Sequence, residues 1–312
     1  MTTTTTTQTL SPDILVRAPE NLWQQALRAF FRQRAATIGL VIITLLALTA
    51  IFAQVIAPYD PIQVLIGVEQ VQRRDPPCIH LLSCPAAKPQ HIMGIDGNVR
   101  DEFSRIIYGA RISFTVGFLT VGFAILVGTV LGAIAGYTGG RSDNIIMRVL
   151  DVLLAFPSLL LAIAIVSVLG PGLINAMLAI AIVSIPAYAR VMRASVLAAK
   201  QEDYVQAARV LGISPGRILF RHIMPNAITP LIVQGTLGIG TAILETAALS
   251  FLGLGAQPPT AEWGSMLSAE RNQVFTAPHL VFLPGLAIML NVLGFNLLGD
   301  GLRDALDPRL RK

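Results

Sequence analysis

The chain has 312 residues, of which 54% are hydrophobic and only 13% charged, and its mean hydropathy is +0.66. These values exclude a soluble domain of this length and indicate an integral membrane protein. The net charge of +5 is no sign of nucleic-acid binding, because the basic residues cluster between apolar segments, where they indicate membrane topology.

The first 34 residues are mostly polar and precede the first apolar segment. They lack the basic start and short apolar core of a cleavable signal peptide, so we expect the first span to remain in the mature chain. Residues 21–34 place a row of apolar side chains on one helical face, which favours a helix in the inner headgroup layer. A plain cytoplasmic extension of the first span is the alternative. The row of apolar side chains in residues 21–34 consists of Trp23, Leu27, Phe30 and Phe31.

Six apolar runs are long enough to cross the hydrocarbon core, which takes roughly 20 helical residues for about 30 Å. The first run carries no charge, and the fourth follows a Gly-Pro-Gly turn at 170–172. In the second run Gly128, Gly132 and Gly136 are spaced four apart, which is typical of close helix packing. The expected spans are 35–57, 112–137, 146–169, 172–190, 229–253 and 278–299.

Basic residues indicate the orientation of these spans. With the N-terminus inside, the inner segments collect 16 of the 23 Lys and Arg residues. The others fall mostly in one long outer loop, which the positive-inside rule discounts. We therefore expect both termini in the cytoplasm, with a cytoplasmic tail over 1–34, a first span over 35–57, an extracytoplasmic loop over 58–105 and a five-helix core over 106–312.

The outer loop holds both cysteines of the chain, Cys78 and Cys84. Their short separation on the outer side of the membrane favours a disulfide, and two free thiols are the next alternative. A metal site formed by these cysteines with His80 and His91 has suitable ligand types but no recognised spacing, so we predict no metal.

Two acidic residues lie within the expected spans, where a charge costs at least about 2.5–3.5 kcal/mol at the helix centre. Asp151 lies six residues before Pro157, which we expect to kink the third span, and Arg148 is a turn away and can pair with it. Glu245 lies deeper and should face either a partner helix or a translocation path. Trp263, in the outer segment that follows, is a candidate interfacial anchor.

Residues 202–225 form a polar, arginine-bearing segment between the fourth and fifth spans. Tyr204, Ala207, Ala208 and Leu211 fall at i, i+3, i+4 and i+7, and this spacing predicts one apolar helical face. Gly212 is placed to end that helix in the left-handed conformation.

The same segment has signals for a second helix. Ser214 predicts its cap, Pro215 its first turn and Pro225 its end. Together the two patterns predict a helix–glycine–helix elbow at the membrane surface, suited to docking another protein.

The elbow resembles the cytoplasmic loop motif of ABC importer permeases, Glu-Ala-Ala, three residues, Gly, nine residues, then Ile-x-Leu-Pro. The spacing from Gln206 through Gly212 to Pro225 is kept, and the departures are Gln206 for Glu, His222 for Ile and Met224 for Leu. The resemblance implies an ATPase-coupling role for Tyr204, Gln206, Ala207, Ala208, Gly212 and Pro225.

Four further stretches are similar to permeases for dipeptides, oligopeptides and nickel. The first, HIMGIDGNVRDEFSRIIYGARISFTVG, departs from the family pattern at Ile95 and Val99. The others read MRVLDVLLAFPSLLLAIAIVSVLGPG, ETAALSFLGLGAQPPTAEWGSML and LGDGLRDALDPR. They cover residues 91–310 and resemble the second permease subunit of that family, in which one N-terminal span is added to a five-helix core. The fold implied is an all-α polytopic membrane bundle of six transmembrane helices.

The resemblance also implies the partners. They are a second homologous permease subunit, two cytoplasmic ATPase subunits, an extracytoplasmic solute-binding protein and membrane lipid. The chain would supply half of a translocation pathway for dipeptides or oligopeptides, with nickel, metal chelates and glutathione as alternative solutes.

Motifs for catalysis are absent from the sequence. No lysine follows a glycine in a G-x-x-x-x-G-K-[ST] loop, and neither His-Glu-x-x-His nor Gly-x-Ser-x-Gly occurs. We therefore expect no catalytic residues and no cofactor in this chain, with ATP and Mg²⁺ held by the partner ATPases. The competing classes are a non-transporting membrane scaffold and a proton-coupled carrier that uses Glu245.

Overall fold

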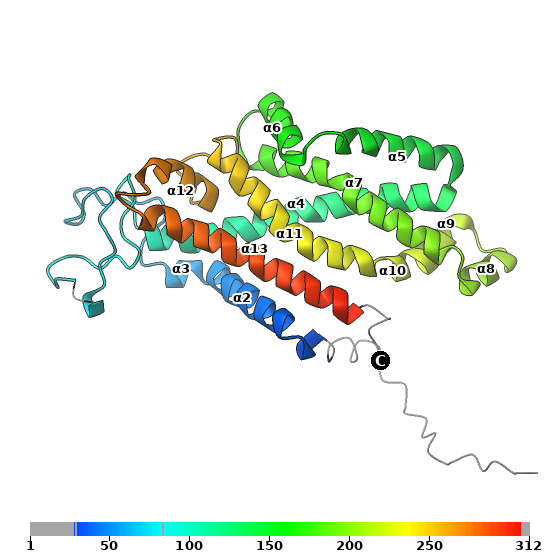
Figure 1. The fold of residues 1–312 in the computed structure, drawn as a ribbon, viewed down its shortest axis with the longest axis horizontal. Coiled ribbons are helices and arrows are strands. Elements are labelled where there is room, and N and C mark those ends of the chain that lie inside the picture. The colour runs from blue at the N-terminus through cyan, green and yellow to red at the C-terminus, as the bar shows by residue number, and fades with distance from the viewer. Residues whose placement is uncertain (1–27, 29, 83, 307–312) are drawn as a thin grey trace, which may run out of the picture.

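The protein is an all-helical bundle whose long helices follow one common axis (Figure 1). Its structure, a computed structural model, describes residues 28, 30–82 and 84–306. Trp23 and Leu27 of the expected interfacial helix lie outside these residues. The long helices are α2 (Arg34–Ile51), α4 (Glu102–Thr138), α7 (Leu173–Ala199), α11 (Thr229–Phe251) and α13 (His279–Leu306).

Shorter elements connect the long helices. Two of them, α5 (Gly140–Leu154) and α6 (Ser158–Leu169), lie between α4 and α7. The remaining ones are α3 (Ala53–Ile56), η1 (His80–Leu82), α8 (Asp203–Val210), α9 (Pro215–Arg217), the π-helix η2 (Ile218–Ile223), α10 (Met224–Ala227), α12 (Trp263–Glu270) and η3 (Arg271–Gln273).

The five long helices have the length and hydropathy of membrane spans, and the α5–α6 pair would make a sixth. The expected span at 146–169 is not one straight helix, because α5 and α6 meet at an angle of 90°. The break falls at Pro157, which has no N–H to continue the helix and disfavours a helical conformation in the residue before it. The sequence therefore located the break, but we had expected only a kink.

The second span begins ten residues earlier than expected, at Glu102. Asp101 has an extended backbone and its side chain accepts a hydrogen bond of 2.7 Å from the N–H of Ser104, so it caps α4. Hydropathy alone missed this part of the helix, because Glu102, Arg105 and Arg111 interrupt its apolar residues. The fourth span is likewise longer than expected, since α7 continues to Ala199.

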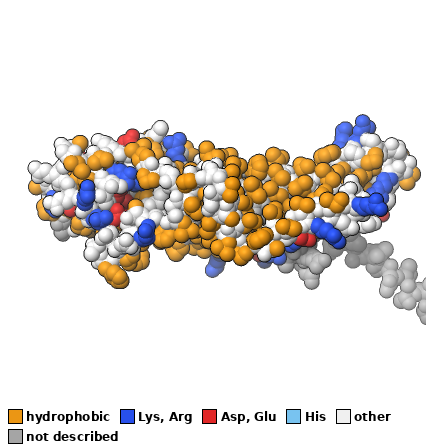
Figure 2. All heavy atoms as spheres, turned by 90° about the horizontal axis from the view of Figure 1, so that it is seen from above, with side chains coloured by type: hydrophobic (Ala, Val, Ile, Leu, Met, Phe, Trp, Pro, Cys, Tyr) orange, Lys and Arg blue, Asp and Glu red, His pale blue; other side chains and the backbone are white. Residues whose placement is uncertain are grey.

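Close helix contacts hold the bundle together. α4 packs most extensively on α7, and α2 packs on α13. A Cβ at Gly132 would fall on the backbone of Ala189, so the glycine spacing of the second span does permit the close approach that we expected. Apolar side chains cover the middle of the molecule, whereas Lys and Arg gather toward its ends (Figure 2).

The two ends of the bundle differ. We call the end with residues 58–101 and α12 the loop end, and the end with α8 to α10 the elbow end (Figure 1). Trp263 at the loop end is only 1% exposed and donates a hydrogen bond of 3.0 Å to the carbonyl of Ile106. The expectation that Trp263 is an interfacial anchor was therefore wrong, and this side chain is part of the core.

Candidate functional site

The elbow forms between α8 and α10 as a helix, a turn and a second helical run. Gly212 ends α8 with a φ of +72°. Across this turn the N–H of Gly212 donates to the carbonyl of Arg209 at 3.0 Å, and the N–H of Ile213 donates to the carbonyl of Ala208 at 3.1 Å. This pair of bonds is a Schellman motif, which favours glycine because a Cβ is strained at positive φ.

The second half of the elbow differs from the expectation. Ser214 does precede the first turn, which starts at Pro215, but its side chain makes no capping hydrogen bond. Pro225 does not end the helix, because α10 continues to Ala227. The wider turns of η2 directly before α10 make room for the proline ring, which would otherwise crowd the carbonyl of Arg221.

The four residues expected on one apolar face of the elbow do not share one environment. Ala208 is 4% exposed and packs inward beside Val205, which is fully buried. Ala207 points outward and is exposed, and Leu211 is 78% exposed. The expected face was wrong because Val205 replaces Leu211 on the inner side of this two-turn helix.

The outer surface of the elbow is apolar and basic. Val210 is 88% exposed and Phe220 is 63% exposed. Three arginines, Arg209, Arg217 and Arg221, are exposed on the same short segment. Exposed apolar side chains rimmed by polar residues are typical of protein interaction sites.

Side-chain hydrogen bonds tie the elbow to the bundle. Gln206 Nε2 donates to the carbonyl of Lys200 at 3.2 Å, which a glutamate at this position could not do. Lys200 Nζ in turn donates to the carbonyl of Tyr137 at 2.7 Å. Asn226 Nδ2 donates to the hydroxyl of Tyr204 at 3.3 Å, so α8 and α10 are joined as well.

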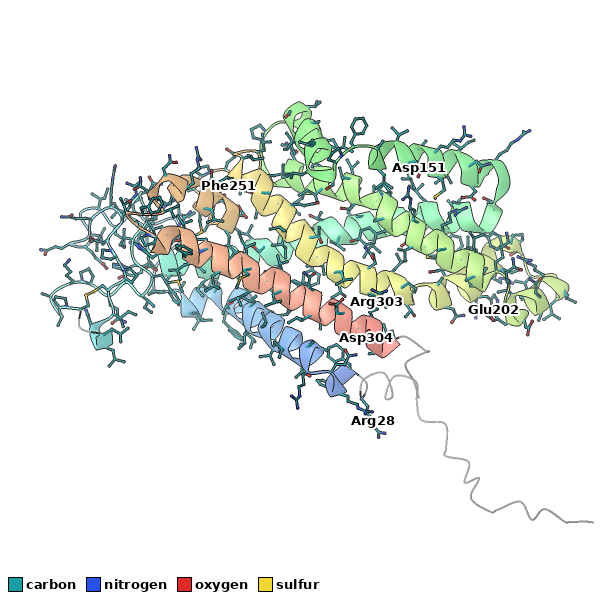
Figure 3. The ribbon with its side chains drawn as sticks, in the orientation of Figure 1. Arg28, Asp151, Glu202, Phe251, Arg303 and Asp304 are labelled. Atoms are coloured by element: carbon teal, nitrogen blue, oxygen red, sulfur yellow. A yellow bond between two sulfur atoms is a disulfide. The ribbon has the colours of Figure 1, made fainter. Side chains whose placement is uncertain are left out.

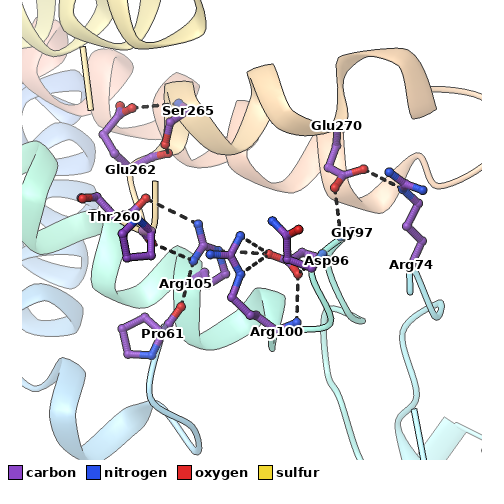
Figure 4. A network of polar contacts seen from close by, with 12 residues as sticks. Pro61, Arg74, Asp96, Gly97, Arg100, Arg105, Thr260, Glu262, Ser265 and Glu270 are labelled. Carbon is purple, nitrogen blue, oxygen red and sulfur yellow. Dashed lines mark hydrogen bonds and ion pairs between the residues drawn. The ribbon is translucent and has the colours of Figure 1, made fainter. Parts of the chain in front are cut away.

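At the opposite end, a buried ion-pair network joins the outer loop to the helices (Figure 4). Arg100 and Arg105 share the carboxylate of Asp96, with N–O distances of 2.7 and 3.5 Å. Arg105 Nη1 also donates to the carbonyl of Pro61 at 2.8 Å. Glu270 accepts from Arg74 Nε at 2.8 Å and from the N–H of Gly97 at 2.9 Å.

His91 is the centre of a second cluster in this loop. Its Nδ1 lies 2.7 Å from Asp101 and its Nε2 lies 3.1 Å from Glu69, while the ring stacks on Tyr59. Burial alone would lower the pKa of His91, but the hydrogen bonds and charges of Asp101 and Glu69 outweigh it and raise that pKa. Burial, together with the bond to Glu69, raises the pKa of Tyr59 to about 12.

The cysteines and histidines of the loop have other partners than a metal ion. Cys78 and Cys84 are joined by a disulfide, with their Cα atoms 5.4 Å apart. His80 Nε2 lies 2.8 Å from the carbonyl of Lys88, and both ring nitrogens of His91 are engaged by carboxylates. Within the described residues, no group of three or more His, Cys, Asp or Glu side chains is placed to hold a metal.

The two acidic residues of the spans, Asp151 of α5 and Glu245 of α11, make their contacts beside the α5–α6 break. Asp151 Oδ1 pairs with Arg190 Nη2 of α7 at 2.5 Å, so the expected partner, Arg148, was wrong. The reason is that Arg190 reaches Asp151 from a neighbouring helix, which one-dimensional spacing does not reveal. Glu245 accepts a hydrogen bond of 3.2 Å from Ser158 Oγ at the start of α6.

These observations define an integral membrane protein of the permease class: an apolar helical bundle with a braced outer loop at one end and an exposed elbow at the other. The chain belongs to the family described as the binding-protein-dependent transport system inner membrane component, which it matches over residues 128–312. Residues 21–77 match the N-terminal TM domain of oligopeptide transport permease C. The chain is therefore a component of the inner membrane and a transport subunit.

Individual relatives agree along nearly the whole chain. The dipeptide transport system permease protein DppC of Alkalihalophilus pseudofirmus is 49% identical over 93% of this chain and 90% of its own length. The glutathione transport system permease protein GsiD of Pectobacterium atrosepticum is 46% identical, covering 96% of this chain and 94% of the relative. A chain in an inward-facing structure of the methionine ABC transporter MetNI is similar in fold, with a TM-score of 0.53 and 17% identity. The match covers 66% of this chain and 98% of that one. This last match supports the fold alone.

Sequence reasoning did not single out the polar clusters of the loop end. Asp96, Arg100, Asp101 and Arg105 all lie in the stretch that resembles other permeases, and that stretch was the available signal. Together with Glu102 they make five charged residues within ten positions, and spacing alone does not show which of them pair with one another.

Proposed function

We propose that the chain is one of two permease subunits in an ABC importer of peptides, and that it forms half of the translocation pathway. The family match supports the transport role. Relatives of this chain are named for dipeptide and for glutathione transport, and both kinds of solute are short, zwitterionic peptides. Nickel and metal chelates remain alternative solutes. In this arrangement the elbow end and both termini face the cytoplasm.

The exposed elbow is the observation that carries the coupling role. Its apolar and basic surface is suited to an ATPase subunit with a complementary acidic rim, and ATP and Mg²⁺ would be bound there rather than in this chain. A second permease, a second ATPase and an extracytoplasmic solute-binding protein would complete the transporter. The loop end, with its disulfide and buried ion pairs, would face the solute-binding protein.

The hydrogen bonds around the elbow suggest how a movement of the ATPase reaches the bundle. The chain of contacts from Gln206 to Lys200 and from Lys200 to Tyr137 joins the elbow to the ends of α7 and α4. Arg193 Nε and Nη2 donate to the carboxylate of Asp143 at 2.6 Å each, and so join α7 to α5. A displaced elbow would therefore carry α4, α5 and α7 with it, which is the alternating-access movement that an importer requires.

The test is uptake by the complete transporter in proteoliposomes. We expect uptake of a labelled dipeptide that requires ATP, the ATPase subunits and the solute-binding protein. Glutathione and Ni²⁺, assayed in parallel, would define the solute. Uptake that follows a proton gradient without any nucleotide would instead identify a proton-coupled carrier, and a chain that retains no ATPase on purification would favour a scaffold.

A further inference from the structure

Two polar pairs flank the α5–α6 break, within segments that are otherwise apolar. Before the break, Asp151 pairs with Arg190, and these side chains are 55% and 53% exposed. After the break, Ser158 donates to Glu245 of α11. Figure 3 shows Asp151 on α5, away from both ends of the bundle. Asp151 and Ser158, which make these two contacts, thus lie on α5 and α6 on opposite sides of the break.

Polar groups in this position do not suit contact with lipid. Exposed side chains on the rest of the spans are typically apolar, such as Val41 and Leu45 of α2 at 51% and 58% exposure. A charged side chain at the centre of a bilayer costs at least about 2.5–3.5 kcal/mol. Charged residues in spans therefore face a bundle interior or a water-filled cavity, and here the exposed pair is not inside this bundle.

A stripe of polar and small residues runs along α11 and includes Glu245. Positions 234, 238, 241, 245 and 248 follow the spacing of one helical face, and all are partly or fully exposed in this chain. The rest of α11 is mostly apolar, with buried side chains at Ile239, Ile243 and Leu249 and exposed ones at Ile232 and Leu244. The stripe consists of Gln234, Gly238, Thr241, Glu245 and Ala248.

Glu245 itself has no cationic partner among the described residues. Its hydrogen bond comes from the neutral hydroxyl of Ser158, and no Lys, Arg or His of that part of the chain forms an ion pair with it. Ser158 is the first residue of α6, whose N-terminus favours a negative charge nearby. The carboxylate is thus held in position by a neutral hydroxyl and a helix N-terminus, which leaves it free to pair with a cation from outside this chain.

We propose that the face formed around the α5–α6 break and the α11 stripe lines the translocation pathway, and that Glu245 binds the α-ammonium group of the passing peptide. This inference rests on the proposed function, because it presumes a peptide solute. The Asp151–Arg190 pair is internally neutral, so Glu245 is the carboxylate of this face that is left to attract the cationic end of a zwitterion. A single carboxylate binds weakly enough for release, as passage through a pore requires.

Cysteine accessibility tests whether the face is wet. The chain contains only two cysteines, and these form the disulfide, so an introduced cysteine is the only free thiol of the subunit. In the complete transporter, Thr241→Cys should react with a cationic methanethiosulfonate reagent, and the dipeptide should slow this reaction. Leu45→Cys, on the apolar surface of α2, is the control that should not react. If Thr241→Cys stays unreactive during turnover, the second subunit seals this face from water and the proposal is wrong.

Charge substitution tests the role of Glu245. Glu245→Gln should lower ATP-dependent dipeptide uptake about tenfold, since a hydrogen bond to a charged group is replaced by a neutral one. Glu245→Asp, which keeps the charge, should retain most of the uptake. The control is Asp300→Asn, a charge removal at an exposed position near the end of α13, away from the loop end and the elbow. Peptide protection of Thr241→Cys should also disappear in the Glu245→Gln background, which a merely structural role of Glu245 does not predict.

The outcomes separate this inference from the proposed function. If the parent transporter takes up no peptide at all, the proposed function is wrong. If the parent takes up peptide and Glu245→Gln does so equally well, only the role of Glu245 is wrong. Loss of uptake by Glu245→Gln with unchanged peptide protection of Thr241→Cys would show that the carboxylate does not bind the solute.

Discussion

The N–H of Ile213 donates to the carbonyl of Ala208, 3.1 Å away across the Gly212 turn. This bond fixes the direction in which the second half of the elbow leaves α8, and it requires Gly212 to keep its φ of +72°. Because no atom lies within 4 Å of the place where a Cβ would stand, a side chain at this position meets backbone strain and no steric clash.

Gly212→Leu should therefore leave the folded bundle intact while it uncouples ATP hydrolysis from uptake. A side chain at positive φ costs about 1–2 kcal/mol, which the short elbow would relieve by changing its turn. Uptake per ATP hydrolysed in proteoliposomes is the measurement. Gly216→Leu is the matched control, because Gly216 is equally open but does not have a positive φ. If Gly212→Leu and Gly216→Leu take up the same amount of solute per ATP hydrolysed, the turn has no role in coupling.

The two alanines of the elbow should respond differently to enlargement. Ala208→Leu places extra volume against the chain's own interior, where Ala208 is 4% exposed, so we expect a loss of about 1–3 kcal/mol in the stability of the subunit. Ala207→Leu leaves the subunit stable, because Ala207 is exposed, but it should weaken retention of the ATPase. Thermal stability of the isolated subunit and co-purification of the ATPase measure the two effects. An ATPase that is retained in full by Ala207→Leu would remove Ala207 from the interface.

The elbow also illustrates how far sequence reasoning reaches. The positions of Gly212 and Pro215 were predictable, because the conformations of glycine and proline depend on their own backbone. The inward orientation of Val205 and the pairing of Asp151 with Arg190 depend on which helix lies beside which. Such contacts are set by tertiary packing, and no spacing within one segment encodes them.

The cysteines of the outer loop should be inaccessible to thiol reagents unless a reductant is present. Their disulfide closes a short loop around η1, and an oxidising compartment on the outer side of the membrane would preserve it. An impermeant maleimide applied to intact membranes, before and after reduction, is the measurement. Labelling of both cysteines without reductant would show that they are free thiols.

Removal of the Arg105 guanidinium should destabilise the loop end strongly. Arg105 is 4% exposed and connects α4 to Asp96 and to the carbonyl of Pro61. Arg105→Met keeps most of the volume but leaves Asp96 with one cation instead of two. Because breaking a buried ion pair costs about 3–5 kcal/mol, we expect a clearly lower melting temperature of the purified subunit. Arg73→Met is the control, since Arg73 is exposed in the same loop and should have little effect.

The stability of the loop end should depend on pH through His91. Its pKa is raised in the folded protein, so the proton it binds stabilises the fold. This contribution is fully present below the unfolded pKa of about 6.5. It is lost as the pH rises through the higher, folded pKa, where the imidazole gives up one of its two hydrogen-bond donors. The melting temperature should therefore fall with rising pH across this window in the parent protein. In His91→Asn, which cannot titrate, that part of the pH dependence should be absent. A melting temperature that falls equally in both proteins would assign the effect to other groups.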